Sequence, residues 1–180
     1  DFHFYKGDGP IQDQIKSIHT LHIDVQKGYL YANTLAIHPI EILDLNPDPY
    51  NPVYAGNFSG LTTHDCYVDN DTVYGAHLGV LSMIDVSDKS NPVLLGTAPT
   101  PGAFTHNTWL LDNHQYLLTT DEAKPSFVTA YDISDPADIK EVCRVSSNDG
   151  YGAVAHNTQV LNDWAITGWY KDGVVIADAH

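Results

Sequence analysis

The stretch Thr105-His106-Asn107-Thr108-Trp109-Leu110-Leu111 decides how the sequence divides, because versions of it recur along the chain. The other copies are Ile18-His19-Thr20-Leu21-His22-Ile23, Thr63-His64-Asp65-Cys66-Tyr67-Val68 and Ala155-His156-Asn157-Thr158-Gln159-Val160-Leu161. With the four histidines in register, the copies are spaced by 45, 42 and 50 residues. The sequence is therefore built from four repeats.

A second element recurs within each repeat: a β-prone run that ends in an aspartate. These runs are 40–45, 80–86, 127–133 and 174–178, and their last aspartates are Asp44, Asp85, Asp132 and Asp178. A turn rich in Asn, Asp and Pro follows, then a short strand such as Pro52–Gly56 or Pro92–Gly96. A period in the forties is the length of one four-stranded propeller blade. The sequence predicts an all-β protein, a β-propeller of four-stranded antiparallel blades, with about four blades in this chain.

We expect residues 1–180 to form a single β-propeller domain or a propeller fragment, with blades starting near residues 19, 64, 106 and 156. The expected strands are 19–24, 28–33, 39–45 and 52–58; 64–69, 72–77, 79–86 and 92–97; an inner strand from 106, then 115–120, 126–133 and an outer strand ending near 146; and an inner strand from 156, then 163–169 and 173–177. Helical periodicity is not evident, and Asn70-Asp71 has the composition of a tight hairpin turn.

The repeat resembles the LVIVD-repeat β-propellers, including the choice-of-anchor B group of secreted and cell-surface bacterial proteins. The resemblance covers nearly the whole chain. It implies an extracellular or cell-surface protein. It says little about activity, because that family is defined by its repeat.

The fourth repeat lacks its outer strand. The aromatic segment Phe2–Tyr5 has, by register, the place of an outer strand in a blade whose other strands lie elsewhere. Without a partner, the third strand at Gly173–Ala177 would expose a row of backbone donors and acceptors. We expect it to be covered by Phe2–Tyr5, by the equivalent segment of another copy, or by residues outside these 180. The last two are favoured, so the chain could be part of a larger ring completed by a second chain or copy.

The amino-acid composition limits the kinds of partner that the protein can bind. Eight Lys and Arg residues against 23 Asp and Glu residues give a formal net charge of −15, which argues against nucleic acid and anionic membrane surfaces. No apolar run is long enough for a spanning helix, so membrane insertion is not expected. Cys66 and Cys143 fall on an inner and an outer strand, and a disulfide between them is not expected.

Two sets of loops should converge at one mouth of the propeller, by strand alternation. The loops that enter the inner strands carry the candidate metal ligands His19, His64, His106 and His156. The loops between second and third strands carry the candidate ligand-binding residues His77, Asp121, Glu122, Tyr170 and Lys171. The axial mouth is the usual ligand site of this fold.

Imidazoles close to carboxylates could hold Zn²⁺, Fe²⁺ or Cu²⁺, with Asp65, Asn107 and Asn157 orienting the rings. Alternatively, each histidine could hydrogen-bond to the neighbouring blade and help to close the ring. The aspartates that end the third strands should accept backbone N–H groups in the turns, with calcium binding as the alternative.

Two functions remain open. The first is an exported binding or scaffold module, with a protein or small-molecule ligand at the histidine-lined mouth. The second is a metal-dependent hydrolase or lyase that uses the same histidines. The sequence favours the first, because it has no phosphate loop, nucleophile elbow or cysteine cluster.

Overall fold

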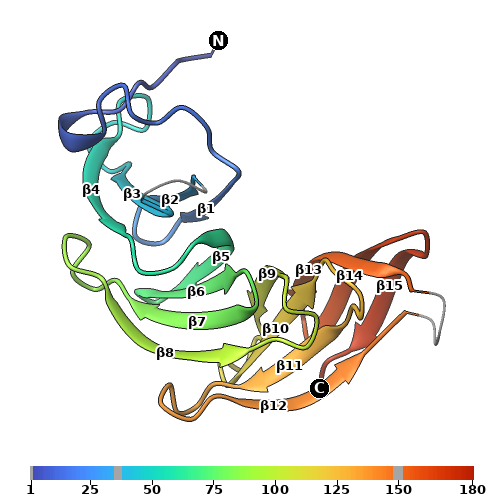
Figure 1. Cartoon of the computed structure of the whole chain (residues 1–180). Coiled ribbons are helices and arrows are strands. Elements are labelled where there is room, and N and C mark those ends of the chain that lie inside the picture. The colour runs from blue at the N-terminus through green and yellow to red at the C-terminus, as the bar shows by residue number, and fades with distance from the viewer. Residues whose placement is uncertain (1, 35–37, 148–151) are drawn as a thin grey trace.

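A computed structural model describes residues 2–34, 38–147 and 152–180. The described residues form fifteen strands in four antiparallel sheets, and their single helical element is the 3-10 turn η1 (Gly9–Ile11). Figure 1 shows the sheets following one another around an arc. The predicted all-β fold class is confirmed. Nothing among the described residues forms a helix with the length and hydropathy of a membrane span.

Each sheet corresponds to one repeat of the sequence. Blade 1 contains β1 (Thr20–Asp24), β2 (Tyr29–Asn33), β3 (Ile40–Asp44) and β4 (Val53–Phe58). Blade 2 contains β5 (Thr63–Asp69), β6 (Thr72–His77), β7 (Val80–Asp85) and β8 (Val93–Pro99). Blade 3 contains β9 (Thr105–Leu110), β10 (Tyr116–Asp121), β11 (Val128–Asp132) and β12 (Lys140–Val145). Blade 4 has three strands: β13 (Val154–Leu161), β14 (Trp164–Tyr170) and β15 (Gly173–Asp178).

The turns follow the chemistry of their residues. Asn70 and Asp71 form the two-residue β5–β6 connection with φ of 45° and 59°, and Asn162 and Asp163 do the same between β13 and β14 with φ of 51° and 58°. The aspartates that end the third strands each accept the backbone N–H two residues later, over 2.7 to 3.0 Å. This confirms the predicted hydrogen bonds at Asp44, Asp85, Asp132 and Asp178.

The core lies between blades, and each junction has its own apolar cluster. Tyr31, Ile40 and Ile42 of blade 1 pack against blade 2. Tyr74, Leu81 and Met83 of blade 2 pack with Leu110, Leu117 and Tyr131 of blade 3. Leu118 and Val128 of blade 3 pack with Ala155, Val160, Ala165 and Trp169 of blade 4. The strands carry apolar residues on both faces of each blade. Each face is therefore buried only where a neighbouring blade packs against it.

Glycines in the outer strands let adjacent blades approach closely. A Cβ atom on Gly56 of β4 would lie 1.8 Å from the Lys89 carbonyl oxygen, in the β7–β8 turn of blade 2. A Cβ atom on Gly96 of β8 would lie 1.8 Å from the Pro136 carbonyl oxygen, in the β11–β12 turn of blade 3. The repeated Pro-to-Gly strand of the sequence therefore provides the space in which the next blade's turn packs.

The prediction that Phe2–Tyr5 forms a strand is wrong. This segment has no strand partner, and Phe2 and Phe4 are exposed. Instead, the Tyr5 hydroxyl donates to the carboxylate of Asp8, which also accepts the Tyr54 N–H over 2.9 Å. These contacts hold the segment at the outer strand of its own blade 1, so it leaves β15 uncovered. The two cysteines are free, as expected, with Cys66 buried and Cys143 exposed.

Candidate functional site

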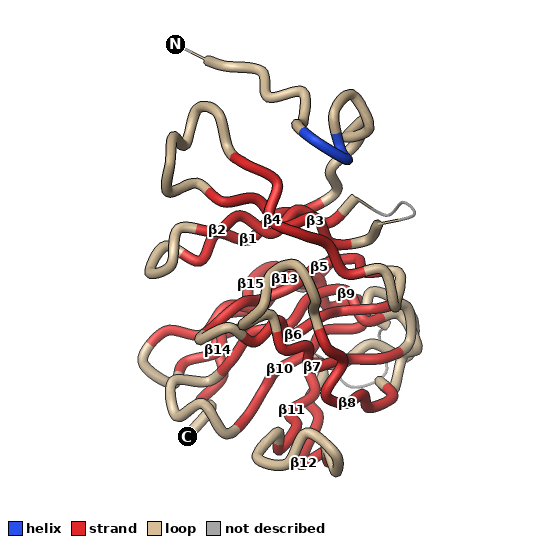
Figure 2. The backbone as a smooth tube through the Cα atoms, turned by 90° about the vertical axis from the view of Figure 1, so that its left-hand side faces the viewer, coloured by secondary structure: helices blue, strands red, loops and turns tan. Residues whose placement is uncertain are grey.

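The four repeated histidines, which we call the histidine row, lie at the beginnings of the inner strands: His19 directly before β1, His64 and His106 second in β5 and β9, and His156 third in β13. Figure 2 shows these strands from the side of the chain. The pairing register skips His64 between Thr63 and Asp65, and skips His106 between Thr105 and Asn107. At blade 4 the register passes from Ala155 to Thr158, which leaves His156 in the same kind of bulge. A β-bulge turns a side chain away from the regular alternation. The bulges therefore set these imidazoles apart from the faces that pack between blades.

The structure brings the histidine row together. Ring centroids lie 4.3 Å apart for His19 and His64, 4.3 Å for His64 and His106, and 4.0 Å for His106 and His156. The Tyr170 ring follows, 5.1 Å from His156. Four residues separated by more than forty positions in sequence thus form one continuous line of rings.

Backbone carbonyls decide the proton positions on two of these rings. The Nδ1 atom of His64 lies 2.9 Å from the His106 carbonyl oxygen, and the Nδ1 atom of His106 lies 3.2 Å from the His156 carbonyl oxygen. A carbonyl oxygen can only accept, so each Nδ1 carries the proton and the neutral ring keeps a lone pair on Nε2. His19 Nε2 lies 2.8 Å from His64 Nε2 and is therefore the donor in that pair.

The His64 and His106 rings stay neutral near pH 7. Burial lowers the pKa of His64 and outweighs the hydrogen bond to the His106 carbonyl, which acts in the opposite direction. Burial, together with the adjacent His64 and His156, lowers the pKa of His106 to about 4. A neutral imidazole with an unprotonated Nε2 can ligate a metal ion through that atom.

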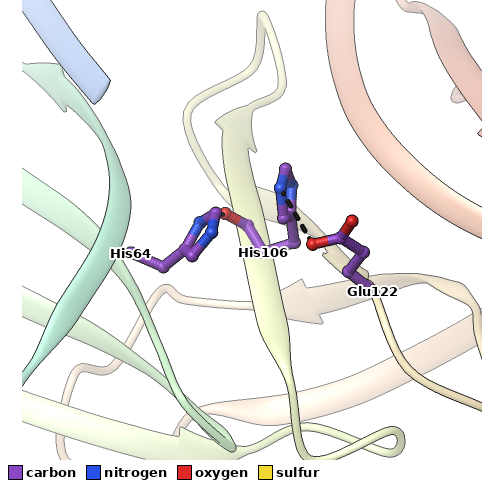
Figure 3. A group of neighbouring side chains, drawn as sticks. All are labelled: His64, His106 and Glu122. Atoms are coloured by element: carbon purple, nitrogen blue, oxygen red, sulfur yellow. Dashed lines mark hydrogen bonds and ion pairs between the residues drawn. The ribbon is translucent and has the colours of Figure 1, made fainter. Parts of the chain in front are cut away.

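Glu122 approaches the row from the β10–β11 connection (Figure 3). Its N–H donates to the Phe104 carbonyl oxygen over 2.9 Å, which fixes the loop. One carboxylate oxygen lies 3.4 Å from His106 Nε2, and the other lies 3.7 Å from His156 Nε2 and accepts the Tyr170 hydroxyl over 2.7 Å. One ligand atom each from His64, His106 and Glu122 lies within 4.8 Å of the other two.

The other predicted ligand-binding residues lie elsewhere. His77 is 2 % exposed, and its ring bonds to Ser82 Oγ over 2.6 Å and to Thr62 and Thr63 over 3.2 Å. Asp121 is fully buried and accepts Thr100 Oγ1 over 2.9 Å and the Phe104 N–H over 3.2 Å. Lys171 is exposed in the β14–β15 turn. Of this set, Glu122 and Tyr170 are the two that the described contacts join to the histidine row.

The orienting role predicted for Asp65 and Asn107 is corrected by their hydrogen bonds. Asn107 Nδ2 donates to Asp65 Oδ2 over 2.9 Å, and Asn107 Oδ1 accepts the Thr158 N–H over 3.0 Å. Asp65 Oδ1 accepts the N–H of Cys66 over 2.9 Å. Both side chains therefore join blades instead of contacting the imidazoles, while Asn157 is exposed on blade 4. No pattern in the sequence revealed this bridge, since the His-Asn or His-Asp step suits either role.

Comparisons with known proteins extend the description of the fold. No protein-family model and no curated protein matches the sequence of the chain. Among solved structures, the computationally designed Ika4 protein is 14 % identical with a TM-score of 0.65, over 100 % of this chain and 99 % of that one. The WD40 domain of Neurospora crassa Pan2 is 10 % identical with a TM-score of 0.70, over 91 % of this chain and 47 % of that one.

A third similar structure is the Cps50 (Swd1) β-propeller domain of Myceliophteria thermophila, 9 % identical with a TM-score of 0.64, over 84 % of this chain and 53 % of that one. The chain thus spans about half the length of the two fungal chains. Structural similarity at this level of sequence identity supports a shared fold and no shared function. Together with the four-stranded blades, it identifies the fold of the chain as a β-propeller.

Proposed function

We propose that this chain is a binding module of the β-propeller class whose histidine row holds a divalent transition metal. The ligands are His64 Nε2, His106 Nε2 and a carboxylate oxygen of Glu122. The observation that carries the proposal is that one potential ligand atom from each of His64, His106 and Glu122 lies within 4.8 Å of the other two. Two nitrogen ligands with one oxygen ligand suit Zn²⁺, Fe²⁺ or Cu²⁺ better than Ca²⁺, which prefers oxygen.

The electrostatics support a cation at this place. His106 Nε2 carries a lone pair because its Nδ1 donates to a carbonyl, and a carboxylate oxygen of Glu122 faces it at 3.4 Å. Two acceptors that face each other repel unless a proton or a metal ion lies between them. Burial opposes the proton, because it lowers the pKa of His106 to about 4. A metal ion relieves the repulsion without protonating the ring.

Small side-chain movements complete the coordination. Zinc bonds of about 2.0–2.2 Å require the ligand atoms to move closer than 4.8 Å. The Glu122 side chain is 24 % exposed and has room to rotate. His19, now hydrogen-bonded to His64 Nε2, and His156, beside Glu122, are the candidates for a fourth ligand.

Calorimetric titration of metal-free protein with ZnCl₂ tests the proposal. We expect one zinc ion per chain and at least a tenfold loss of affinity in both His106→Gln and Glu122→Gln. The matched control is His114→Gln, because His114 is exposed and pairs with Asp69, away from the histidine row. Equal zinc affinity in His106→Gln and His114→Gln, or no zinc binding at millimolar concentration, would contradict the metal site.

The three-ligand set also favours a second candidate function. Metal ions held by two histidines and one carboxylate keep a position for water, which is the arrangement of catalytic zinc sites. Metal-dependent hydrolysis or lyase chemistry is therefore the alternative to binding alone. The zinc-loaded protein would be screened against ester, lactone and phosphate substrates. Activity that is lost in Glu122→Gln and retained in His114→Gln would support the enzyme.

Export to the cell surface or the medium belongs to the same proposal. It rests on the resemblance to the LVIVD-repeat propellers and is compatible with the net charge of −15. An antibody raised against the chain would locate the protein in fractions of the source cells. Detection in the medium or on intact cells is expected, and recovery from the cytosolic fraction alone would argue against export.

A further inference from the structure

The four blades form an open arc with blades 1 and 4 at its ends (Figure 1). Contacts between successive inner strands run from β1 to β5, from β5 to β9 and from β9 to β13. Each internal junction therefore joins two faces. We call the face of a blade that is turned toward the next blade in sequence its trailing face, and the face turned toward the preceding blade its leading face. The trailing face of blade 4 and the leading face of blade 1 remain without a neighbouring blade among the described residues.

The trailing face of blade 4 has the composition of a buried junction. In blade 2 the trailing positions are Tyr74, Leu81 and Met83, which are 7 %, 0 % and 6 % exposed. The hairpin register places three residues of blade 4 at these same positions. They are Ile166, Val174 and Ile176, and they are 37 %, 68 % and 62 % exposed. Three apolar side chains that the repeat normally buries thus lie at the surface.

The leading face of blade 1 shows the matching feature. Cys66 and Val68, two and four residues after the histidine of blade 2, are each 4 % exposed because blade 1 covers them. The equivalent residues after His19 are Leu21 and Ile23, which are 55 % and 43 % exposed. At these positions, the two ends of the arc therefore carry apolar residues that elsewhere pack together in a junction, whereas Glu41 and Leu43 of β3, on the same face of blade 1, are already buried.

Blade 4 also has exposed polar groups of the kind that form hydrogen bonds between successive blades elsewhere in the chain. His64 and His106 each donate through Nδ1 to the carbonyl oxygen of the next histidine in the row. Within the described residues, no acceptor is present for Nδ1 of His156. On an incoming blade 1, the equivalent acceptor is the carbonyl oxygen of His19. Asn157 is likewise exposed, whereas Asn107, at the same place in blade 3, is buried and bonded on both sides.

We propose that a second copy of this chain completes the ring, with blade 4 of each copy packed on blade 1 of the other. A two-fold axis forms both junctions at once and leaves no blade face open. The chain covers 47 % and 53 % of the fungal propeller chains that it matches, so two copies together have about the extent of one such chain. The histidine row then becomes continuous across both junctions.

The acidity of the chain gives the association a defined salt dependence. Two copies with a formal charge of −15 each repel one another, while the residues that meet are apolar. Salt screens the repulsion and leaves hydrophobic burial in place. The dimer should therefore become tighter as NaCl is raised from 20 mM to 500 mM.

Sedimentation equilibrium of the 180-residue chain tests the proposal directly. The expected mass is about twice the 19.8 kDa of one chain at micromolar concentration. Ile176→Lys and Ile23→Lys should each give monomers, with unchanged far-ultraviolet circular dichroism to show that they remain folded. Leu94→Lys, at a 44 % exposed position of the outer strand β8, is the matched control and should remain dimeric.

Mixing the two monomeric variants distinguishes this ring from other dimers. In an equimolar mixture, one junction pairs two altered faces, but the other pairs two unaltered faces. A heterodimer should therefore form, although neither variant dimerises alone. A monomeric wild type at high salt would overturn the proposal and would assign the open faces to further residues of a longer polypeptide. A dimer lost only in Ile176→Lys, or no heterodimer on mixing, would also overturn it. Repeating the wild-type run with a chelator keeps this outcome separate from that of the metal site.

Discussion

Asn107 donates its side-chain N–H to the carboxylate of Asp65 over 2.9 Å, and so ties blade 3 to blade 2. The same side chain accepts the Thr158 N–H of blade 4 over 3.0 Å. Asp65 and Asn107 are 8 % and 4 % exposed. One amide therefore connects three blades inside the fold, where unpaired polar groups are costly.

Replacing Asn107 with alanine should destabilise the fold by about 2–4 kcal/mol, because it leaves a buried carboxylate and a buried N–H without their partner. Urea unfolding followed by circular dichroism measures this change. Asn91→Ala is the matched control, since Asn91 is exposed in the β7–β8 turn and should change stability by less than about 0.5 kcal/mol. Equal effects of the two substitutions would show that the bridge contributes nothing.

Gly96→Ala should destabilise the protein by about 1–3 kcal/mol or more, because the new methyl group would lie 1.8 Å from the Pro136 carbonyl oxygen. The turn of blade 3 would have to move away from β8. Gly168→Ala is the control within a strand, because the nearest atom to its added Cβ is the Asn157 carbonyl oxygen at 3.9 Å. Thermal unfolding should give a lower Tm for Gly96→Ala and a nearly unchanged Tm for Gly168→Ala. A similar Tm for both variants would contradict the close approach of the blades.

Much of this architecture could be predicted from local sequence. The spacing of His19, His64, His106 and His156 located the four blades, and the terminal aspartates located the turns. These features depend on residues close in sequence, so each repeat reports its own structure. Strand alternation also placed Glu122 and Tyr170 on the same side as the histidines, and contacts join both of them to the row.

The remaining features depend on partners that are distant in sequence. Phe2–Tyr5 has high β-propensity, but a strand also requires a neighbour, and the bond from Tyr5 to Asp8 keeps the segment on blade 1. The Nδ1 proton of His64 is set by the His106 carbonyl, 42 residues later. The bulges that separate each histidine from the residue after it depend on strand register, which the identity of the residues does not specify.

Glu41→Gln should make the protein more stable at alkaline pH. Glu41 is 4 % exposed with Oε2 unpaired, and burial raises its pKa to about 7. Between pH 4.5 and 7 the folded state keeps a proton that the unfolded state releases, so this stabilisation is present below pH 4.5 and is lost as pH rises through 7. The amide carries no charge and avoids the loss.

We expect Glu41→Gln to gain about 1–3 kcal/mol relative to wild type at pH 8 and close to nothing at pH 4.5. Urea unfolding at both pH values gives the difference. Burial lowers the pKa of His77 to about 4, so His77 makes the stability depend on pH in the opposite direction. Because the variant and the wild type both contain His77, the difference between their unfolding free energies does not include this effect. The control Glu141→Gln removes an exposed carboxylate paired with Arg144 and should give no gain at pH 8. A gain independent of pH would contradict the assignment to Glu41.

The proton positions in the histidine row are directly measurable. Long-range proton–nitrogen NMR at pH 7 should show His64 and His106 as neutral rings protonated on Nδ1, because each Nδ1 must donate to a carbonyl oxygen. His64→Gln and His106→Gln assign the signals. Lowering the pH to 5.5 should leave His106 neutral, since its pKa lies at about 4, while His180 is charged, since the adjacent Asp178 raises its pKa. A proton on Nε2 of His106 would remove the lone pair from the mouth and, with it, the basis for metal binding.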